Sequence, residues 1–196
     1  MSKKLKGKDI LLAFLYYQGT TDKVCEPIVG KTRITKMMYI FEQEMKSKFS
    51  NLEDGELFEF FAYNYGPYSK ELMENIAFFE SISFIDAEET DELMIPDEIE
   101  DMLSDLNDSV GYGAEILLEE VDIPNQIRYK LTDRGRMYFE DKILNELSEE
   151  QQKLLINFKR KINSLSLDQI LSYVYNKYPD STEKSVIKEK YLRKGE

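Results

Sequence analysis

The chain has 196 residues, of which 42% are apolar, so it is long enough to bury a sizeable core in one domain. It contains no histidine and a single cysteine, Cys25. These counts remove the commonest general base and metal ligand, and they exclude an internal disulfide and a cysteine-based zinc site. We therefore predict no catalytic residues, no metal site and no cofactor, and we expect a protein that is not an enzyme.

The net charge of −12 is unevenly distributed along the chain. Residues 71–127 carry 18 acidic residues and no lysine or arginine, which leaves 20 acidic and 26 basic residues elsewhere. The sequence therefore combines a mildly basic protein with an acidic insertion, which we place at about 86–114. The negative average charge argues against nucleic-acid binding, whereas its segregation leaves such binding open.

The N-terminus imitates a secretion signal, because several lysines precede the apolar run 10–17. However, Asp9 interrupts the basic region, no small-x-small cleavage site follows, and an apolar run this short cannot cross a bilayer. We expect a buried first helix over 8–17 and a cytoplasmic protein that does not bind membranes.

Two more helices and a strand are expected before the acidic insertion. Thr32 is predicted to cap a helix whose apolar residues recur at helical spacing. The aromatic-rich stretch 58–65 predicts a strand, and Gly66-Pro67 predicts a sharp turn after it. Ser69 is then predicted to cap a third helix, which ends near Glu80.

Strands are predicted on both sides of the insertion, which itself contains a short helix at about 96–107. The first strand is expected at 82–85. Two further strands, 116–121 and 127–131, are expected to pair across a turn at Pro124-Asn125. After them, Thr132 is predicted to cap a helix from about Asp133 to Leu147.

The last third of the chain is predicted to be helical. Capping boxes at Ser148–Gln151 and Ser166–Gln169 begin two helices with clear apolar stripes. Tyr178-Pro179 ends the second of them, and 181–192 is expected to form a last short helix.

The predicted order of helices and strands is that of a winged helix-turn-helix, with 68–80 as the third helix and 116–131 as the wing. The tract Tyr129–Gly135 resembles the Y-x-L-T-x-x-G signature at the end of the wing in many winged-helix proteins. We therefore predict an α+β, predominantly helical fold. It comprises a winged-helix-like domain over 1–147, which contains the acidic insertion, and a helical C-terminal extension over 148–196.

Two tracts resemble a narrower family. Lys36–Ile40 is similar to the K-L-hydrophobic-Y tract of YwgA-like proteins, and Phe61–Leu72 is similar to their aromatic-x-x-G-P-hydrophobic motif. Over roughly 8–140 the chain thus resembles the YwgA-like and SocA-type antitoxin-like family, also called the Panacea or phage-associated family. Tyr173–Pro179 also resembles the C-terminal end of the YwgA-like branch.

The resemblance implies a non-enzymatic protein that acts by binding a protein partner, either a toxin or a regulatory target. The matching tracts supply the candidate partner-binding residues, which are Tyr65, Gly66, Pro67, Tyr68, Ser69, Lys36 and Tyr39. Gly66-Pro67 is equally explained as a turn that the fold requires, because glycine and proline mostly mark backbone constraints. The partner and the oligomeric state are left open.

The alternative is a winged-helix transcriptional regulator that binds DNA. The one dense basic tract would then contact nucleic acid, and it consists of Arg128, Lys130, Arg134 and Arg136. The predicted third helix has Lys70 as its only basic residue among several carboxylates, which phosphates repel. We therefore expect DNA binding to be weak and independent of sequence.

Overall fold

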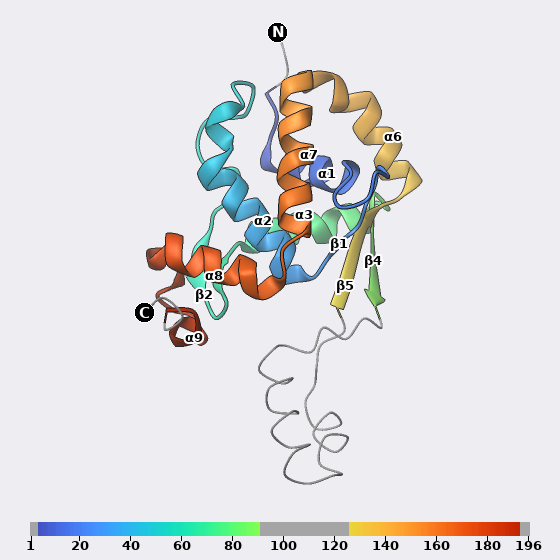
Figure 1. The fold of residues 1–196 in the computed structure, drawn as a ribbon. Coiled ribbons are helices and arrows are strands. Elements are labelled where there is room, and N and C mark those ends of the chain that lie inside the picture. The colour runs from blue at the N-terminus through green and yellow to red at the C-terminus, as the bar shows by residue number, and fades with distance from the viewer. Residues whose placement is uncertain (1–3, 91–125, 193–196) are drawn as a thin grey trace, which may run out of the picture.

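The computed structural model describes residues 4–90 and 126–192 (Figure 1). The fold is α+β and mostly helical, with two small antiparallel sheets. In these two ranges no helix is long and apolar enough to cross a membrane. The helix predicted at 96–107 and the strand predicted at 116–121 lie outside the described residues.

The described helices are α1 (Gly7–Tyr16), α2 (Lys31–Glu44), α3 (Lys70–Ser81), α6 (Asp133–Lys142), α7 (Glu149–Asn163), α8 (Leu167–Lys177) and α9 (Lys188–Leu192). The strands are β1 (Ile28–Val29), β2 (Phe61–Tyr63), β3 (Gly66–Tyr68), β4 (Ile85–Thr90) and β5 (Gln126–Leu131). Short 3-10 turns are η1 (Lys46–Lys48), η2 (Leu144–Glu146) and η3 (Pro179–Thr182).

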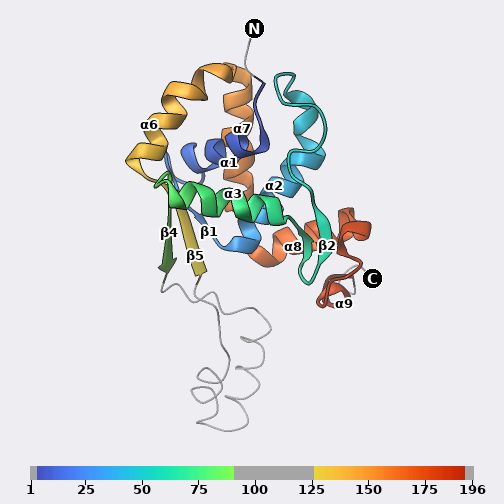
Figure 2. The same cartoon turned by 180° about the vertical axis from the view of Figure 1, so that it is seen from behind.

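The core is built around α1, whose residues are all buried except Lys8. A helix that is apolar on every side must be covered on every side, and α1 lies in the middle of the molecule in both opposed views (Figures 1 and 2). Its Phe14 ring lies 5.3 Å from Phe41 of α2 and 5.4 Å from Phe158 of α7, measured between ring centroids. The N-terminal helix is thus confirmed as a buried core helix.

The C-terminal helices pack into the same hydrophobic core as the preceding chain. Leu155 of α7 and Val174 of α8 are fully buried in the cluster that also contains α1. Both predicted capping boxes are present, because the Ser148 and Ser166 hydroxyls each accept a hydrogen bond from the amide three residues later. One hydrophobic cluster therefore includes both sides of the domain boundary expected at 147/148.

The larger sheet has the order β1-β5-β4, with β5 in the middle. The strand predicted at 127–131 is confirmed, and it pairs antiparallel with β4. The segment 116–121, predicted as its partner, lies outside the described residues. β4 also begins and ends later than the strand predicted at 82–85 and overlaps the start assigned to the insertion. The acidic residues of β4 do not favour a strand in the sequence alone. In the structure they form cross-strand ion pairs with Lys130, which stabilise the pairing.

The predicted turn at Gly66-Pro67 is wrong, because these residues form β3 of a hairpin. β2 and β3 pair antiparallel, with Tyr63 opposite Gly66 and Ala62 opposite Pro67, and the chain reverses at Asn64-Tyr65. Ser69 follows β3 directly and caps α3, as predicted, by accepting a hydrogen bond from the Leu72 amide at 3.2 Å. Figure 2 shows α3 running from this hairpin toward β4.

Three helix boundaries differ from the predictions. The last helix, expected over 181–192, is α9 and begins only at Lys188. α2 begins at Lys31 with Gly30 at the N-cap position, so Thr32 lies inside its first turn and is not its cap. α6 is capped by Thr132, as expected, but it ends at Lys142, and the 3-10 turn η2 replaces its predicted last part.

Gly135, in the first turn of α6, lies against the backbone that leads into β4. A Cβ atom there would lie 2.1 Å from the carbonyl oxygen of Phe84. We predict that Gly135→Ala lowers the free energy of unfolding by about 1–3 kcal/mol, because the strand or the helix must move. Helix propensity alone predicts the opposite sign, since alanine is favoured over glycine by about 1 kcal/mol. Denaturant unfolding of the full chain measures the change.

Met137→Ala is the matched control, because Met137 lies in the same helix and is 66% exposed. Its effect should stay within about 0.5 kcal/mol. A Gly135→Ala protein as stable as the unchanged one would contradict the close approach.

Candidate functional site

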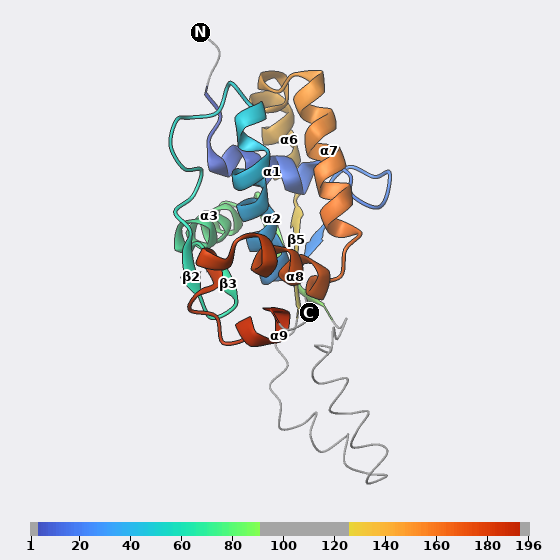
Figure 3. The ribbon, with the colours of Figure 1, turned by 60° about the vertical axis from the view of Figure 1, so that its left-hand side comes forward.

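The two tracts that resemble the antitoxin-like family meet in the structure through Lys36 and Pro67. Lys36 lies on α2 and is only 2% exposed. Its Nζ donates a hydrogen bond to the Pro67 carbonyl oxygen at 2.8 Å. Burial lowers the pKa of Lys36 to about 7. This contact fixes β3 against α2, and Figure 3 shows the hairpin beside α2 and α8.

Gly66 is required both by its backbone angle and by the space around it. Its φ is 82°, a region that side chains with a Cβ rarely adopt. A Cβ there would lie 3.2 Å from the ring of Tyr175 and 3.6 Å from Lys36 Nζ. At the tip of the hairpin, Ser185 donates a hydrogen bond to the carbonyl oxygen of Asn64 at 2.9 Å. The hairpin is therefore held by α2, α8 and the C-terminal segment.

Most of the predicted partner-binding residues are buried and support the hairpin. Besides Lys36 and Gly66, these are Pro67, Ser69 and Tyr39, whose ring contacts Phe60 at 5.2 Å between centroids. Tyr65 at the hairpin tip is 55% exposed, and Tyr68 is half-buried. The structure thus brings the predicted residues together but presents only the two tyrosines to solvent.

Sequence reasoning missed two further aromatic residues, Phe61 and Tyr63, which lie beside Tyr68 on one side of the hairpin. The ring of Tyr68 lies 5.6 Å from Phe61 and 5.4 Å from Tyr63, between centroids. Phe61 is 45% exposed and Tyr63 is 49% exposed. We call these three residues the aromatic face. Their spacing of two residues in β2 could have indicated it, since alternate strand residues share a side.

Acidic residues lie next to the aromatic face. The Glu71 carboxylate on α3 accepts a hydrogen bond from the Glu59 amide at 3.3 Å, which places two acidic residues just before β2 and just after β3. Lys70, the only basic residue of α3, pairs with Glu74 at 3.1 Å. The surroundings of the hairpin are therefore negatively charged.

The basic tract predicted for nucleic acid faces acidic residues of its own chain. Lys130 pairs with Glu88 at 2.6 Å and with Asp86 at 3.4 Å, and both partners belong to β4. Arg128 lies opposite Glu88 in the same ladder.

The two arginines of this tract on α6 are also engaged. Arg136 pairs with Glu140 at 3.6 Å. The guanidinium of Arg134 lies 5.5 Å from the centroid of the Phe84 ring. The acidic residues of β4, and Glu140 one helical turn from Arg136, thus offset much of the positive charge of this basic tract.

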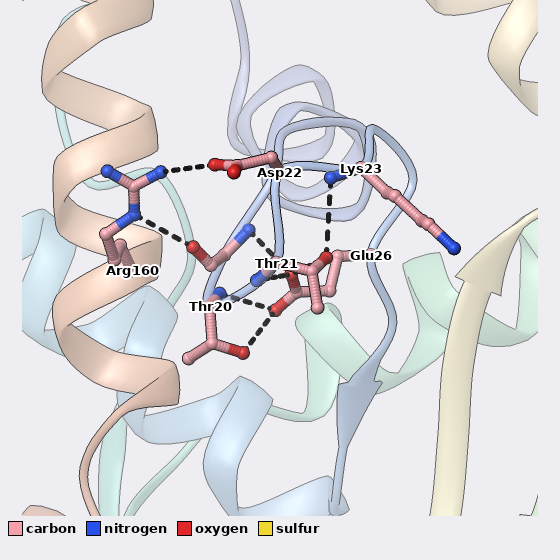
Figure 4. Close-up of polar contacts among 7 residues, drawn as sticks. Thr20, Thr21, Asp22, Lys23, Glu26 and Arg160 are labelled. Atoms are coloured by element: carbon pink, nitrogen blue, oxygen red, sulfur yellow. Dashed lines mark hydrogen bonds and ion pairs between the residues drawn. The ribbon is translucent and has the colours of Figure 1, made fainter.

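A second polar cluster surrounds Glu26 in the loop after α1 (Figure 4). Its carboxylate accepts hydrogen bonds from the amides of Gly19, Thr20 and Thr21 at 3.1, 2.8 and 2.6 Å. Burial raises the pKa of Glu26, but these bonds and others from hydroxyl and amide side chains outweigh it and lower the pKa to about 2. Lys159 of α7 also donates to the Glu26 carbonyl oxygen at 2.5 Å. The cluster closes the loop on itself and fastens it to α7.

We predict that Lys36→Met destabilises the protein and changes its pH dependence. The Pro67 carbonyl oxygen loses its donor, which should cost about 1–3 kcal/mol near pH 9. The pKa of Lys36 is about 7 in the folded chain and 10.5 without burial, so the unfolded chain binds more protons between these values. Lys36 therefore makes stability rise with pH in this interval, and the variant lacks that rise. Denaturant unfolding from pH 7 to about 9.5 measures both effects.

Lys70→Met is the control, since the Lys70 side chain is 79% exposed. It should change stability by about 0.5 kcal/mol or less and leave the slope with pH unchanged. If the stability of Lys36→Met and that of the unchanged protein change with pH in parallel, Lys36 does not lose its proton in the folded chain between pH 7 and about 9.5, and the prediction is wrong.

We also predict that Glu26→Gln lowers the melting temperature at neutral pH and has little effect in acid. The folded pKa of Glu26 is about 2 against an ordinary 4.5, so its contribution is present above 4.5 and lost as pH falls toward 2. Thermal melts between pH 7 and 2 measure the difference in melting temperature between Glu26→Gln and the unchanged protein. Asp22→Asn is the control, because the Asp22 side chain is exposed. A gap that persists undiminished at pH 2 would contradict the role of the ionised carboxylate.

Comparison with protein-family models, with curated proteins and with solved structures finds no match to the chain. The resemblance of Lys36–Ile40 and Phe61–Leu72 to antitoxin-like proteins therefore stays a prediction. What supports a proposal for the function is the arrangement of the hairpin, its buried lysine and its exposed rings.

Proposed function

We propose that this protein is a non-enzymatic interaction module that binds a protein partner through the aromatic face. The observation that carries the proposal is the contact among the exposed rings of Phe61 and Tyr63 and the half-buried ring of Tyr68. Exposed aromatic clusters mark interaction sites, and tyrosine is enriched among the residues that dominate binding energy. The hairpin is held in place before binding, so little conformational entropy is lost when a partner docks.

We further propose that the domain is winged-helix-like. In its favour, α1, β1, α2, α3, β4 and β5 follow one another in the order of that fold, and the sheet has the order β1-β5-β4. In this proposal the antiparallel pair β4–β5 takes the place of the wing, and Thr132 caps the helix that follows it. The additional β2–β3 hairpin lies between α2 and α3, which is where the aromatic face is presented.

The partner that we propose is a protein with a basic surface. The chain carries a net charge of −12, and Glu59 and Glu71 lie next to the aromatic face. Charge of opposite sign accelerates encounter and suppresses wrong partners. The resemblance to SocA-type antitoxins supports a toxin as this partner.

A DNA-binding regulator is less well supported, although the order of elements is compatible with it. Glu71, Glu74 and Glu80 on the exposed side of α3 would face phosphates in a major groove. Lys130, the best-placed base of the wing, is already paired with two carboxylates. Sequence-selective binding to DNA would therefore contradict the proposed protein-binding function.

We predict that Tyr63→Ser weakens partner binding by roughly tenfold or more, as expected for an aromatic residue near the centre of an interface. The products of the neighbouring genes are expressed with the full chain, and their dissociation constants are measured by calorimetry. Where a product is toxic, restored growth gives a second reading. Met137→Ser, on an exposed position of α6, should leave the affinity unchanged.

Three outcomes would contradict the proposal. They are equal affinities of Tyr63→Ser and the unchanged protein, no binding to any neighbouring gene product, and nanomolar sequence-selective binding to duplex DNA at physiological salt. The last would establish the regulator instead.

A further inference from the structure

We propose that a cavity beside the hairpin binds an arginine side chain of the protein partner. The proposal rests on the protein-binding function above and adds the chemistry of one contact. The cavity has a volume of about 340 Å³ and lies where α2, residues 56–62, β3 and η3 meet. Ligand pockets range from roughly 300 to 1,000 Å³, so this one suits a single side chain better than a cofactor.

Aromatic rings form much of the lining, among them those of Tyr39, Phe60 and Phe61. Tyr39 and Phe60 meet edge to face, at 5.2 Å between centroids and an interplanar angle of 71°. Phe61 belongs both to this lining and to the aromatic face. A partner that covers the aromatic face therefore reaches the cavity with a neighbouring side chain.

The polar part of the lining contains three carboxylates, Glu42, Glu56 and Asp180, together with the neutral side chains of Gln43 and Ser181. The Glu42 side chain is 7% exposed and accepts hydrogen bonds from the amides of Leu57 at 2.7 Å and Phe58 at 3.4 Å. Its nearest cation, Lys46, stands 3.9 Å away. Glu56 and Asp180 are exposed, and neither has an ion-pair partner within the described residues. The lining thus combines negative charge with aromatic faces.

A guanidinium group matches this combination better than other cations. It is planar, stacks on aromatic rings and directs several N–H donors toward carboxylates. A metal ion is a poorer match, because no three acidic residues in the described ranges lie close enough together to hold one. A lysine ammonium carries the same charge but lacks the planar stacking surface.

The test is a titration of the isotope-labelled full chain in which binding is monitored through the amide chemical shifts measured by NMR. The probe is N-acetyl-arginine methylamide, and the matched control probe is its citrulline analogue, which has the same shape without the charge. We expect the arginine probe to shift the amides of Tyr39, Phe60 and Ala62 saturably, and the citrulline probe to leave them in place. The lysine analogue should bind more weakly than arginine.

The double variant Glu56→Gln/Asp180→Asn should weaken arginine binding by roughly tenfold, whereas Glu74→Gln on α3 should not change it. Equal shifts by the citrulline probe, shifts scattered over other surface carboxylates, or an unchanged affinity of the double variant would each overturn the proposal. Tyr63→Ser separates it from the function above, because that variant should lose partner affinity and keep probe binding. If the arginine probe does not bind the cavity but Tyr63→Ser still weakens partner binding, only the arginine contact is refuted and the proposed function stands.

Discussion

The hydrogen bond from Lys36 Nζ to the Pro67 carbonyl oxygen is the contact on which the candidate site depends. Taking an ammonium out of water is costly, and the lowered pKa of Lys36 expresses that cost. An apolar side chain would avoid the cost but would leave a buried carbonyl without a donor. The hydrogen bond thus offsets the cost of burying Lys36 and sets β3 against α2, and with it the position of the aromatic face.

The C-terminal helices take part in the same construction. The Glu44 carboxylate at the end of α2 accepts hydrogen bonds from the hydroxyls of Tyr173 at 2.5 Å and Tyr178 at 2.7 Å, and from Lys177 at 2.9 Å. These contacts join α8 to α2, and the following residues reach the hairpin through Ser185. The tyrosine-rich tract near the C-terminus therefore has a defined structural role, which is to hold the hairpin together with Lys36.

The distribution of charge in space differs from its distribution along the chain. From the sequence, the basic residues near 128–136 suggest a surface that binds nucleic acid. In the structure, β4 brings Asp86 and Glu88 beside Lys130. The negative charge around the hairpin and on α3 has less basic compensation, since Lys70 is the only basic residue of that helix. Both features favour a basic protein as partner over a phosphate backbone.

The sequence by itself determined the elements whose signals are local. The buried α1, the Ser69 and Thr132 caps and the two capping boxes each depend on residues within one or two turns of helix, so they could be predicted. Only the tertiary structure decided that Gly66-Pro67 forms a strand, that β4 pairs with β5 and that Lys36 is buried. The β4–β5 pairing and the burial of Lys36 against Pro67 depend on partners far away in the chain, about which local propensity carries no information. The strand at Gly66-Pro67 pairs with residues close in sequence, but glycine and proline favour a turn when read locally. The cavity brings together residues distant in sequence, and the exposure of the aromatic face depends on how the local hairpin packs against α2 and α8, so both became visible only when the chain was folded.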